Sequence, residues 1–186
     1  MHHIAIFASG TGSNARKIIE YFQDSPAVQV ALVVSNKKDA GVLDIARAHD
    51  IPVHVIGRQN FYETEDLLEV LQQQRVDFIV LAGFLWLIPA YLVRAYPRRM
   101  VNIHPALLPK YGGKGMYGIH VHEAVRAADE PETGITIHYV NEHYDEGDIV
   151  FQARCPVAPH DTPADIARNV LTLEHLYYPQ IIDQIL

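Results

Sequence analysis

Short apolar runs alternate with segments of helical periodicity along most of this chain, and this alternation constrains the fold more than any other feature. Five runs are strand-like, at residues 3–8, 28–35, 53–56, 78–81 and 101–104. Between them lie four segments with apolar residues on one helical face, at 14–23, 42–49, 62–74 and 89–95. Continuously apolar strands are typical of a parallel sheet buried on both faces. The sequence therefore predicts a doubly wound, Rossmann-type α/β fold, with a mostly parallel sheet and helices on both faces.

The pattern changes after Tyr117. A helix is expected at residues 120–128, two strands at 133–140 and 149–153, and a long helix at 163–185. We expect this pair of strands to extend the sheet in a different direction. No linker, repeat or low-complexity segment interrupts the 186 residues, so the sequence predicts a single catalytic domain covering 1–186.

Composition argues against several classes of protein. The chain is 49% apolar and 20% charged, as in a soluble globular protein. A formal net charge of −7 argues against nucleic acid or a membrane surface as a partner, so an anionic ligand would need a local site. No apolar run approaches the roughly 18 residues of a membrane-spanning helix, and no signal peptide is visible. Because Cys155 is the only cysteine, we expect an inert thiol and a cytoplasmic protein.

A glycine-containing loop joins the first expected strand to the first helix. It reads Ser9-Gly10-Thr11-Gly12-Ser13-Asn14-Ala15. Glycines allow a tight turn, and the following helix offers free N–H groups to an anion. The spacing matches a dinucleotide fingerprint, but Asn36 stands where an acidic partner for the ribose is expected. The phosphate of a smaller ligand is the favoured functional interpretation, and a plain turn capped by Ser13 or Asn14 is the structural one.

A second polar motif ends the strand at residues 101–104. Asn102 and His104 are two residues apart, so their side chains project to the same side of the strand. Pro105 cannot continue a central strand, which places the pair at the carboxyl end. Open α/β sheets bind ligands outside such ends, so the sequence indicates a functional site here.

The loop between the last two expected strands carries four carboxylates around Gly147. A solvated hairpin is the simplest interpretation. The spacing of a calcium-binding loop is absent, and the histidines form no zinc motif, so we predict no metal.

Several segments together resemble the folate-dependent formyltransferases. They are SGTGSN at residues 9–14, LAGFLWLIP at 81–89, NIHPALLPKY at 102–111, GITIHYV at 134–140, YDEGDIV at 144–150 and LEHLYYP at 173–179. The resemblance runs from residue 4 to about 182 and is strongest to enzymes that formylate glycinamide ribonucleotide in purine biosynthesis. It implies transfer of a formyl group from 10-formyltetrahydrofolate, a co-substrate, to the amine of 5'-phosphoribosylglycinamide. Both implied partners are small molecules.

The resemblance also implies roles for individual residues. His104 is similar to the catalytic histidine, Asn102 to its neighbour that orients the formyl oxygen, and Asp145 to the carboxylate of a mobile loop. An amide N–H of Asn102 and a protonated His104 would stabilise the oxyanion, and Asp145 would keep His104 cationic and relay protons. The implied ribonucleotide site comprises Gly12, Ser13, Asn14, Ala15, Arg16 and Glu174. The implied folate site comprises Leu85, Trp86, Leu87, Ile88, Asn102, Asn141, Glu142, His143, Tyr144 and Asp145.

Two departures from the family pattern stand out. The loop at residues 110–122 is longer and richer in glycine than in many relatives. No arginine matches the one that meets the folate tail in some relatives, and Arg58 is only a nearby candidate.

The sequence bears on four other functions, of which a hydrolase, a non-catalytic relative and an oxidoreductase remain open. A formyltetrahydrofolate hydrolase shares the motifs, although a regulatory domain precedes its first strand, whereas the first strand here begins at residue 3. Methionyl-tRNA formyltransferases lack the SGxGSN loop and carry a further C-terminal domain. A non-catalytic nucleotide-binding relative would not need Asn102, His104 and Asp145 together, and Asn36 weakens a nicotinamide oxidoreductase.

Overall fold

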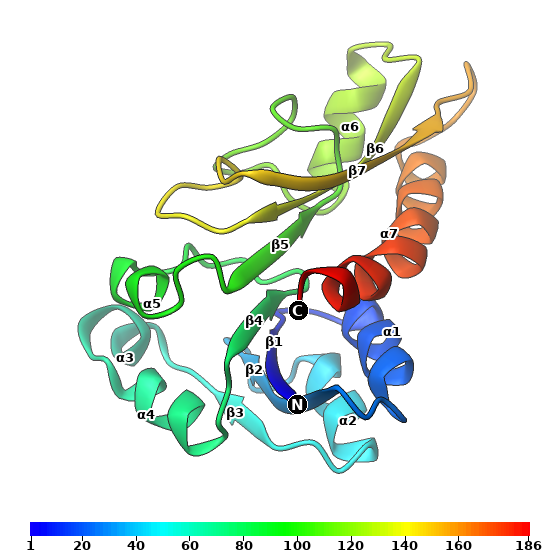
Figure 1. Ribbon diagram of the computed structural model, residues 1–186. Helices are drawn as coiled ribbons and strands as arrows, with labels where there is room; N and C mark the ends of the chain where they lie inside the picture. Colours follow the sequence, from blue (N-terminus) through cyan, green and yellow to red (C-terminus); the bar gives the residue numbers. More distant parts are fainter.

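Strands and helices alternate through the first part of the chain, as the sequence predicts (Figure 1). The computed structural model describes all of residues 1–186. The strands are β1 (His2–Phe7), β2 (Val28–Ser35), β3 (Val53–Val55), β4 (Phe78–Leu81), β5 (Met100–His104), β6 (Glu132–Tyr139) and β7 (Ile149–Pro156). The helices are α1 (Ser13–Phe22), α2 (Gly41–Ala48), α3 (Arg58–Glu63), α4 (Asp66–Gln73), α5 (Ala90–Ala95), α6 (Ile119–Ala127) and α7 (Pro163–Ile185).

All seven strands form one sheet in the order β3-β2-β1-β4-β5-β6-β7. Strands β1 to β5 are parallel, whereas β6 runs antiparallel to β5, and β7 antiparallel to β6. The predicted fold class and the changed direction of the last two strands are both confirmed. The chain winds from β1 to one side through β2 and β3, then returns to the other side at β4. Ligands of open α/β sheets bind at such a switch point, outside the carboxyl ends of the strands.

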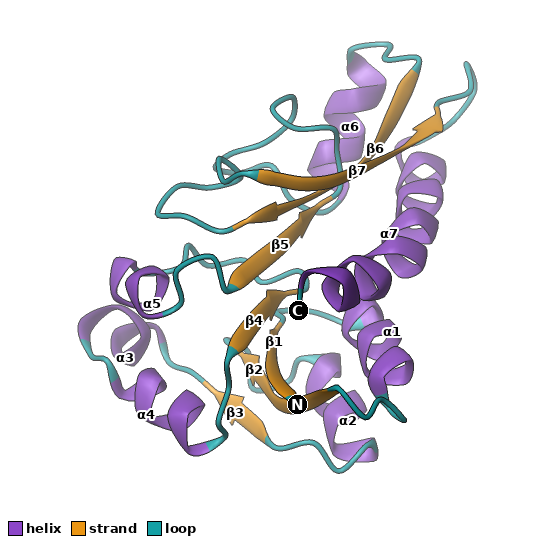
Figure 2. Ribbon diagram, viewed as in Figure 1, coloured by secondary structure: helices purple, strands orange, loops and turns teal.

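Helices cover both faces of the sheet (Figure 2), and each face carries its own hydrophobic core. Along β1, Ile4 and Ile6 pack into the core beneath α1, α2, α6 and α7. Ala5 and Phe7 pack into the core beneath α3, α4 and α5. Because neighbouring residues of one strand enter opposite cores, the strand must be apolar throughout, which is the pattern seen in the sequence.

The helix predicted at residues 62–74 is two helices, α3 and α4, so that prediction is wrong in detail. Thr64 has an extended backbone (φ −126°, ψ 169°), and its Oγ1 donates to the carbonyl of Asn60 at 2.9 Å. A threonine that hydrogen-bonds nearby backbone competes with helical hydrogen bonding. The apolar periodicity continues across the break because Phe61 and Leu67 enter the same core.

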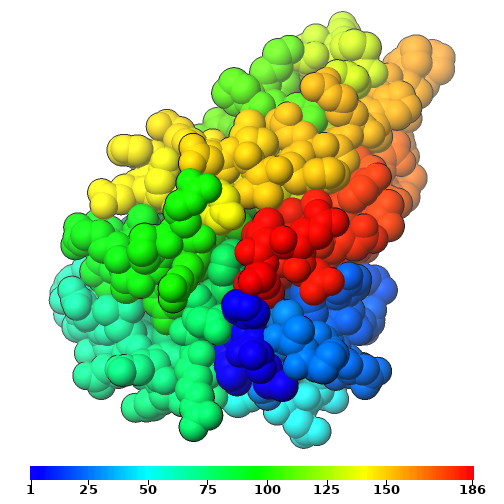
Figure 3. Space-filling view, in the orientation of Figure 1, coloured from blue at the N-terminus to red at the C-terminus, as the bar shows by residue number.

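Helix α7 crosses the centre of the sheet and fixes the end of the chain. Its start is held by a capping box between Thr162 and Asp165. Farther along, the Tyr178 hydroxyl donates to the carbonyl oxygens of Leu81 at 2.8 Å and Val101 at 3.3 Å. This contact ties α7 to the carboxyl end of β4 and to the neighbouring strand β5. Figure 3 shows the last residues of α7, in red, beside the start of β1, in dark blue.

None of the helices is both long enough and apolar enough to cross a lipid bilayer.

Candidate active site

A cavity of about 800 Å³ opens at the carboxyl ends of β4 and β5. Its lining comes from six parts of the chain: the start of α1, the segment after β4, the end of β5, the segments 113–122 and 138–145, and one face of α7. This is the edge of the sheet at which the sequence places Asn102 and His104, and both residues line the cavity.

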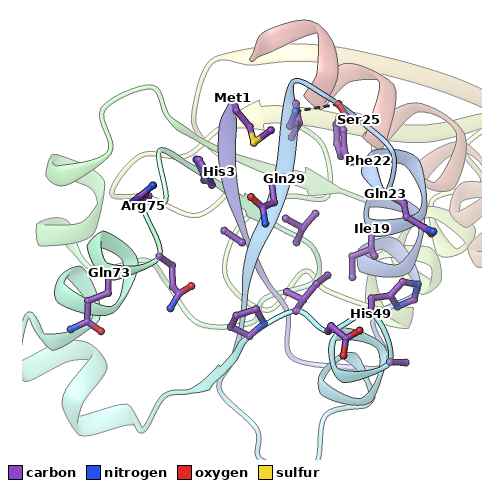
Figure 4. Close-up of a pocket in the computed structure, with 18 residues that line it drawn as sticks. Met1, His3, Ile19, Phe22, Gln23, Ser25, Gln29, His49, Gln73 and Arg75 are labelled. Carbon is purple, nitrogen blue, oxygen red and sulfur yellow. Dashed lines mark hydrogen bonds between the residues drawn. The ribbon is translucent and has the colours of Figure 1, made fainter.

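A second cavity, of about 930 Å³, lies at the opposite, amino end of the strands (Figure 4). Met1, His3 and Gln29 border it together with residues at the carboxyl ends of α1, α2 and α4. Figure 4 shows His3 and Arg75 on one side of this hollow and Gln23 and His49 on the other. None of the predicted site residues lines it.

Asn102, His104 and Asp145 lie together, although the first two are on β5 and Asp145 is on the loop between β6 and β7. Nδ1 of His104 is 3.5 Å from Oδ2 of Asp145, and Nδ2 of Asn102 is 3.4 Å from Oδ1 of the same carboxylate. Asp145 has a left-handed backbone conformation (φ 56°), which aspartate adopts more readily than most residues. The predicted triplet is therefore a cluster in space, in which the carboxylate of Asp145 points inward.

The other carboxylates of the 142–148 loop face away from this cluster. Glu142 does not line the cavity, and its Oε1 lies 4.0 Å from the Arg94 guanidinium. Asp148 is ion-paired with Arg98 at 2.8 Å, also at the surface. The interpretation of a solvated hairpin holds for these residues. Glu142 lies between Asn141 and His143, which both line the cavity, but its own side chain is directed to the surface, and its role in folate binding stays a prediction.

His104 is almost completely buried, with 3% of its surface exposed. Its Nε2 lies 2.7 Å from the carbonyl oxygen of Tyr111. A carbonyl can only accept, so Nε2 carries a proton and Nδ1 is the atom that faces Asp145. The carbonyl of Tyr111 thereby fixes the orientation of the His104 ring.

The charge of His104 in the ligand-free site differs from the charge that the sequence-based hypothesis assigns to it. Burial lowers the pKa of His104, and the nearby carboxylate of Asp145 only partly opposes this effect. In the ligand-free site His104 is therefore neutral at neutral pH, not cationic. Burial would raise the pKa of Asp145, but contacts with His138 and His104 and the N–H of Gly113 hold that pKa below its ordinary value. Asp145 is consequently the ionised member of the cluster.

His138 belongs to the same cluster and was not singled out from the sequence. It pairs with Asn102 across β5 and β6, and its Nε2 lies 3.1 Å from Nδ2 of Asn102 and 3.5 Å from Oδ1 of Asp145. Thr136, two residues earlier on the same side of β6, anchors the strand end by accepting from the N–H of Leu108 at 3.0 Å. Polar residues at alternate positions of an apolar strand were the available signal.

The loop at residues 110–122 also contacts the cluster directly. The N–H of Gly113 donates to Oδ2 of Asp145 at 2.9 Å, next to the Tyr111 carbonyl that holds His104. Lys114 and His122 of this segment line the cavity as well. The sequence motifs alone assign no role to this lengthened loop.

The glycine loop leads into α1 without a side-chain cap. Gly12 is the N-cap residue (φ 80°), and neither Ser13 nor Asn14 caps the helix, so the interpretation of a capped turn is wrong. The N–H groups of Ser13, Asn14 and Ala15 occupy the first turn, where no helical acceptor exists. A Cβ on Gly12 would lie 2.7 Å from Cβ of Val42, so glycine is needed here for packing as well as for its backbone conformation.

Not every predicted residue of this loop is free to bind. The N–H of Arg16 donates to the carbonyl of Gly12 at 2.8 Å, inside the helix. Ala15 is fully buried, so only its backbone could contribute. Asn14 lines the cavity, and its Nδ2 donates to Oε2 of Glu174 at 2.5 Å. Glu174 is 8% exposed, and burial raises the pKa of its carboxyl. Asn14 and Glu174 therefore form a second polar group in the cavity.

The remaining wall of the cavity is largely apolar. Leu85, Trp86, Leu87 and Ile88 all line it, as do Asn141, His143 and Tyr144 on the opposite loop. Trp86 packs against Phe61 and Phe84 at ring-centroid distances of 5.6 and 6.2 Å. The guanidinium of Arg58 lies 5.8 Å from the Trp86 ring centroid, outside the cavity lining. This wall could take a flat aromatic group.

No three or more His, Cys, Asp or Glu side chains are arranged to hold a metal ion, and the absence of a metal from the reaction stays a prediction. Cys155 is partly buried on β7, and burial and the charge of Asp161 raise the pKa of its thiol.

Comparisons with known proteins agree with this geometry. Residues 2–182 match the family model described as formyl transferase. The chain is 46% identical to phosphoribosylglycinamide formyltransferase, chloroplastic, of Arabidopsis thaliana, over 98% of this chain and 64% of the relative. It is 38% identical to phosphoribosylglycinamide formyltransferase of Haemophilus influenzae, over 98% of this chain and 86% of that protein.

The fold is likewise similar to solved structures. Glycinamide ribonucleotide transformylase 1 from Geobacillus kaustophilus superposes with a TM-score of 0.90 at 31% identity, over all of this chain and 99% of that one. The chain spans somewhat less than two thirds of the Arabidopsis relative. With the family model covering nearly the whole chain, this protein belongs to the formyl transferase family.

Proposed function

We propose that this chain transfers a formyl group from 10-formyltetrahydrofolate to the amine of 5'-phosphoribosylglycinamide, a step of purine biosynthesis. One observation carries the proposal: Asn102, His104 and ionised Asp145 meet in a single cavity between two unlike walls. One wall, with the start of α1, Asn14 and Glu174, suits a sugar phosphate. The other, from Leu85 to Ile88, suits a pterin ring.

The ribonucleotide would bind with its phosphate at the first turn of α1. Free N–H groups of Ser13 and Asn14, together with the positive end of the helix dipole, favour an anion there. Glu174 would accept from a sugar hydroxyl. This arrangement would bring the amine toward His104, while the folate would lie between the wall at Trp86 and the loop at Tyr144.

The chemistry requires stabilisation of an oxyanion and transfer of one proton. The amine nitrogen attacks the formyl carbon, forming a C–N bond and placing negative charge on the formyl oxygen. A proton then passes from the attacking nitrogen to N10 of the folate, the C–N10 bond breaks, and the carbonyl re-forms. Tetrahydrofolate leaves with a hydrogen on N10.

His104 and Asp145 would handle this proton as a pair. The neutral His104 has an unprotonated Nδ1 that can accept the proton of the attacking amine. The imidazolium so formed lies beside the carboxylate of Asp145, which stabilises the charge until N10 takes the proton. The protonated histidine of the sequence-based hypothesis would thus arise during the reaction.

Asn102 must change partners before it can act on the substrate. Its amide nitrogen contacts His138 and Asp145 in the ligand-free site. We expect folate binding to draw Asp145 away, so that one N–H of Asn102 turns to the formyl oxygen. One such donor commonly lowers the barrier by about 3 kcal/mol.

We also propose that residues 1–186 form a single catalytic domain and that the protein is cytoplasmic. Its only partners in this proposal are small molecules. The name of the Arabidopsis relative places that protein in the chloroplast.

The decisive experiment supplies 10-formyl-5,8-dideazafolate to the purified chain and records release of the deformylated product by absorbance. Release that requires the ribonucleotide is the expected result. Release without it would support hydrolysis instead, and no release beside an active control enzyme would favour a binding protein.

A further inference from the structure

His122 has an environment that packing does not explain. It lies on α6 with 5% of its surface exposed, between the buried Val121 and the helix turn leading to Val125. Its ring lines the same cavity as His104. A leucine would fill this position of an otherwise apolar helix face with no polar atom to satisfy.

Neither ring nitrogen of His122 has a hydrogen-bond partner within the chain. Nδ1 is fully buried and unpartnered. By contrast, Nε2 of His104 lies 2.7 Å from one backbone carbonyl oxygen, and Nδ1 of His138 lies 2.9 Å from another. A buried polar group without a partner costs about 1–3 kcal/mol. Nε2 is the ring nitrogen that is not fully buried, so it is the atom that a ligand in the cavity could pair with.

The position of His122 indicates which part of the substrate would supply that group. Helix α6 packs on α7, which in turn packs on α1. The α7 residues Ala167, Leu171 and Glu174 line the cavity on this side, away from the wall at Trp86. His104 is close enough to influence His122 electrostatically. His122 therefore lines the cavity near His104, on the side that α6 and α7 form, which the proposed function gives to the ribonucleotide.

The chemical state of the ring restricts the ligand further. Burial, assisted by His104, lowers the pKa of His122, so the imidazole is neutral with one donor and one acceptor nitrogen. A phosphate could satisfy only the donor. A hydroxyl or a carboxamide both donates and accepts, and could pair with either tautomer.

We propose that His122 is a specificity-determining residue that hydrogen-bonds a hydroxyl or the carboxamide of the ribonucleotide, between its amine and its phosphate. This inference rests on the proposed function for the identity of the ribonucleotide.

The direct test follows the ring nitrogens of the histidines by 15N NMR in the full chain, with His122 assigned from the His122→Leu variant. Glycinamide ribonucleotide should shift the His122 signals. Ribose 5-phosphate provides the hydroxyls and the phosphate without the carboxamide, glycinamide provides the carboxamide without either, and inorganic phosphate provides the phosphate alone. A shift with one of the first two identifies the source. Unmoved His122 signals at saturating ribonucleotide, or equal shifts with inorganic phosphate, would overturn the inference.

Kinetics of His122→Leu provide the second measurement. We expect KM for the ribonucleotide to rise about tenfold, equivalent to about 1.4 kcal/mol, with kcat and the KM for folate nearly unchanged. The melting temperature should stay the same or rise, because an unpartnered polar group is removed. His122→Asn, which keeps a donor and an acceptor, should recover part of the affinity.

A matched control is His175→Leu. Nε2 of His175 is also buried and unpartnered, but this residue does not line the cavity. Its KM should remain at the wild-type value. An unchanged KM in His122→Leu as well would reduce His122 to a structural residue.

The two hypotheses fail differently. A wild-type chain that shows no ribonucleotide-dependent formyl release, yet shifts His122 on binding the ribonucleotide, refutes the proposed function alone. An active wild type with an unresponsive His122 refutes this inference alone. A chain that neither binds nor formylates the ribonucleotide refutes both.

Discussion

The two cavities at opposite ends of the sheet have similar volumes, about 930 and 800 Å³, but different chemistry. At the amino end, the carboxyl ends of α1, α2 and α4 converge, and their carbonyl groups repel anions. At the carboxyl end, the amino end of α1 is adjacent to Asn102, His104 and Asp145. Strand direction, not cavity size, therefore decides where an anionic substrate can bind.

The largest effect should come from removing the reacting groups of the carboxyl-end cavity. His104→Ala and Asp145→Ala should each lower kcat by a factor of about 10² to 10⁴, because proton transfer and oxyanion stabilisation both depend on the pair. Binding of the ribonucleotide, measured by calorimetry, should largely survive because the α1 site is untouched. Near-normal turnover in either variant would contradict the assignment.

The second-largest effect is expected from a substitution of Gly12, in the turn that leads into the proposed phosphate site at the start of α1. Gly12→Ala places a Cβ 2.7 Å from Cβ of Val42 on a residue with φ 80°. Strain and overpacking together should lower the free energy of unfolding by roughly 2–4 kcal/mol and weaken ribonucleotide binding. Urea denaturation and calorimetry measure the two effects.

Gly10→Ala is the matched control for that variant. A Cβ at this position meets nothing within 4 Å. Its stability should remain close to wild type, and equal destabilisation by both substitutions would remove the special role of Gly12.

A smaller effect is expected from pH. The pKa values of His104 and His122 are lowered from 6.5 by burial, so the unfolded chain binds more protons than the folded one as the pH falls below about 6.5. Stability should decline with a slope of up to about 1.4 kcal/mol per pH unit for each histidine. Asp145, with its depressed pKa, would lose its contribution only at still lower pH, below 3.8.

Urea midpoints at pH 7.5 and 5.5 test this prediction. Combining His104→Asn with His122→Leu should reduce the difference between the two midpoints. A wild-type urea midpoint that is the same at both pH values would show that the His104 and His122 rings do not control stability in acid.

The smallest effect is expected at the amino-end cavity. Gln29→Ala alters an exposed residue of its lining and should leave kcat/KM unchanged and the free energy of unfolding within about 0.5 kcal/mol. A clear loss of activity would show that this cavity takes part in function after all.

Much of the fold could be predicted because it depends on local patterns. Continuous apolar runs such as 28–35 mark strands buried on both faces, and helical periodicity marks the segments that cover them. Local patterns failed between α3 and α4, where the apolar period continues across a break made by the Thr64 hydroxyl.

For the site, the sequence alone determined that Asn102 and His104 share one side of a strand and lie at its carboxyl end, because strand geometry has a period of two and Pro105 ends the pairing. Only the tertiary structure decided that Asp145 points inward while Glu142 points outward, that His138 joins the cluster, and that burial keeps His104 neutral. These features depend on contacts between segments more than 30 residues apart, on strand register and on desolvation, none of which a local pattern encodes.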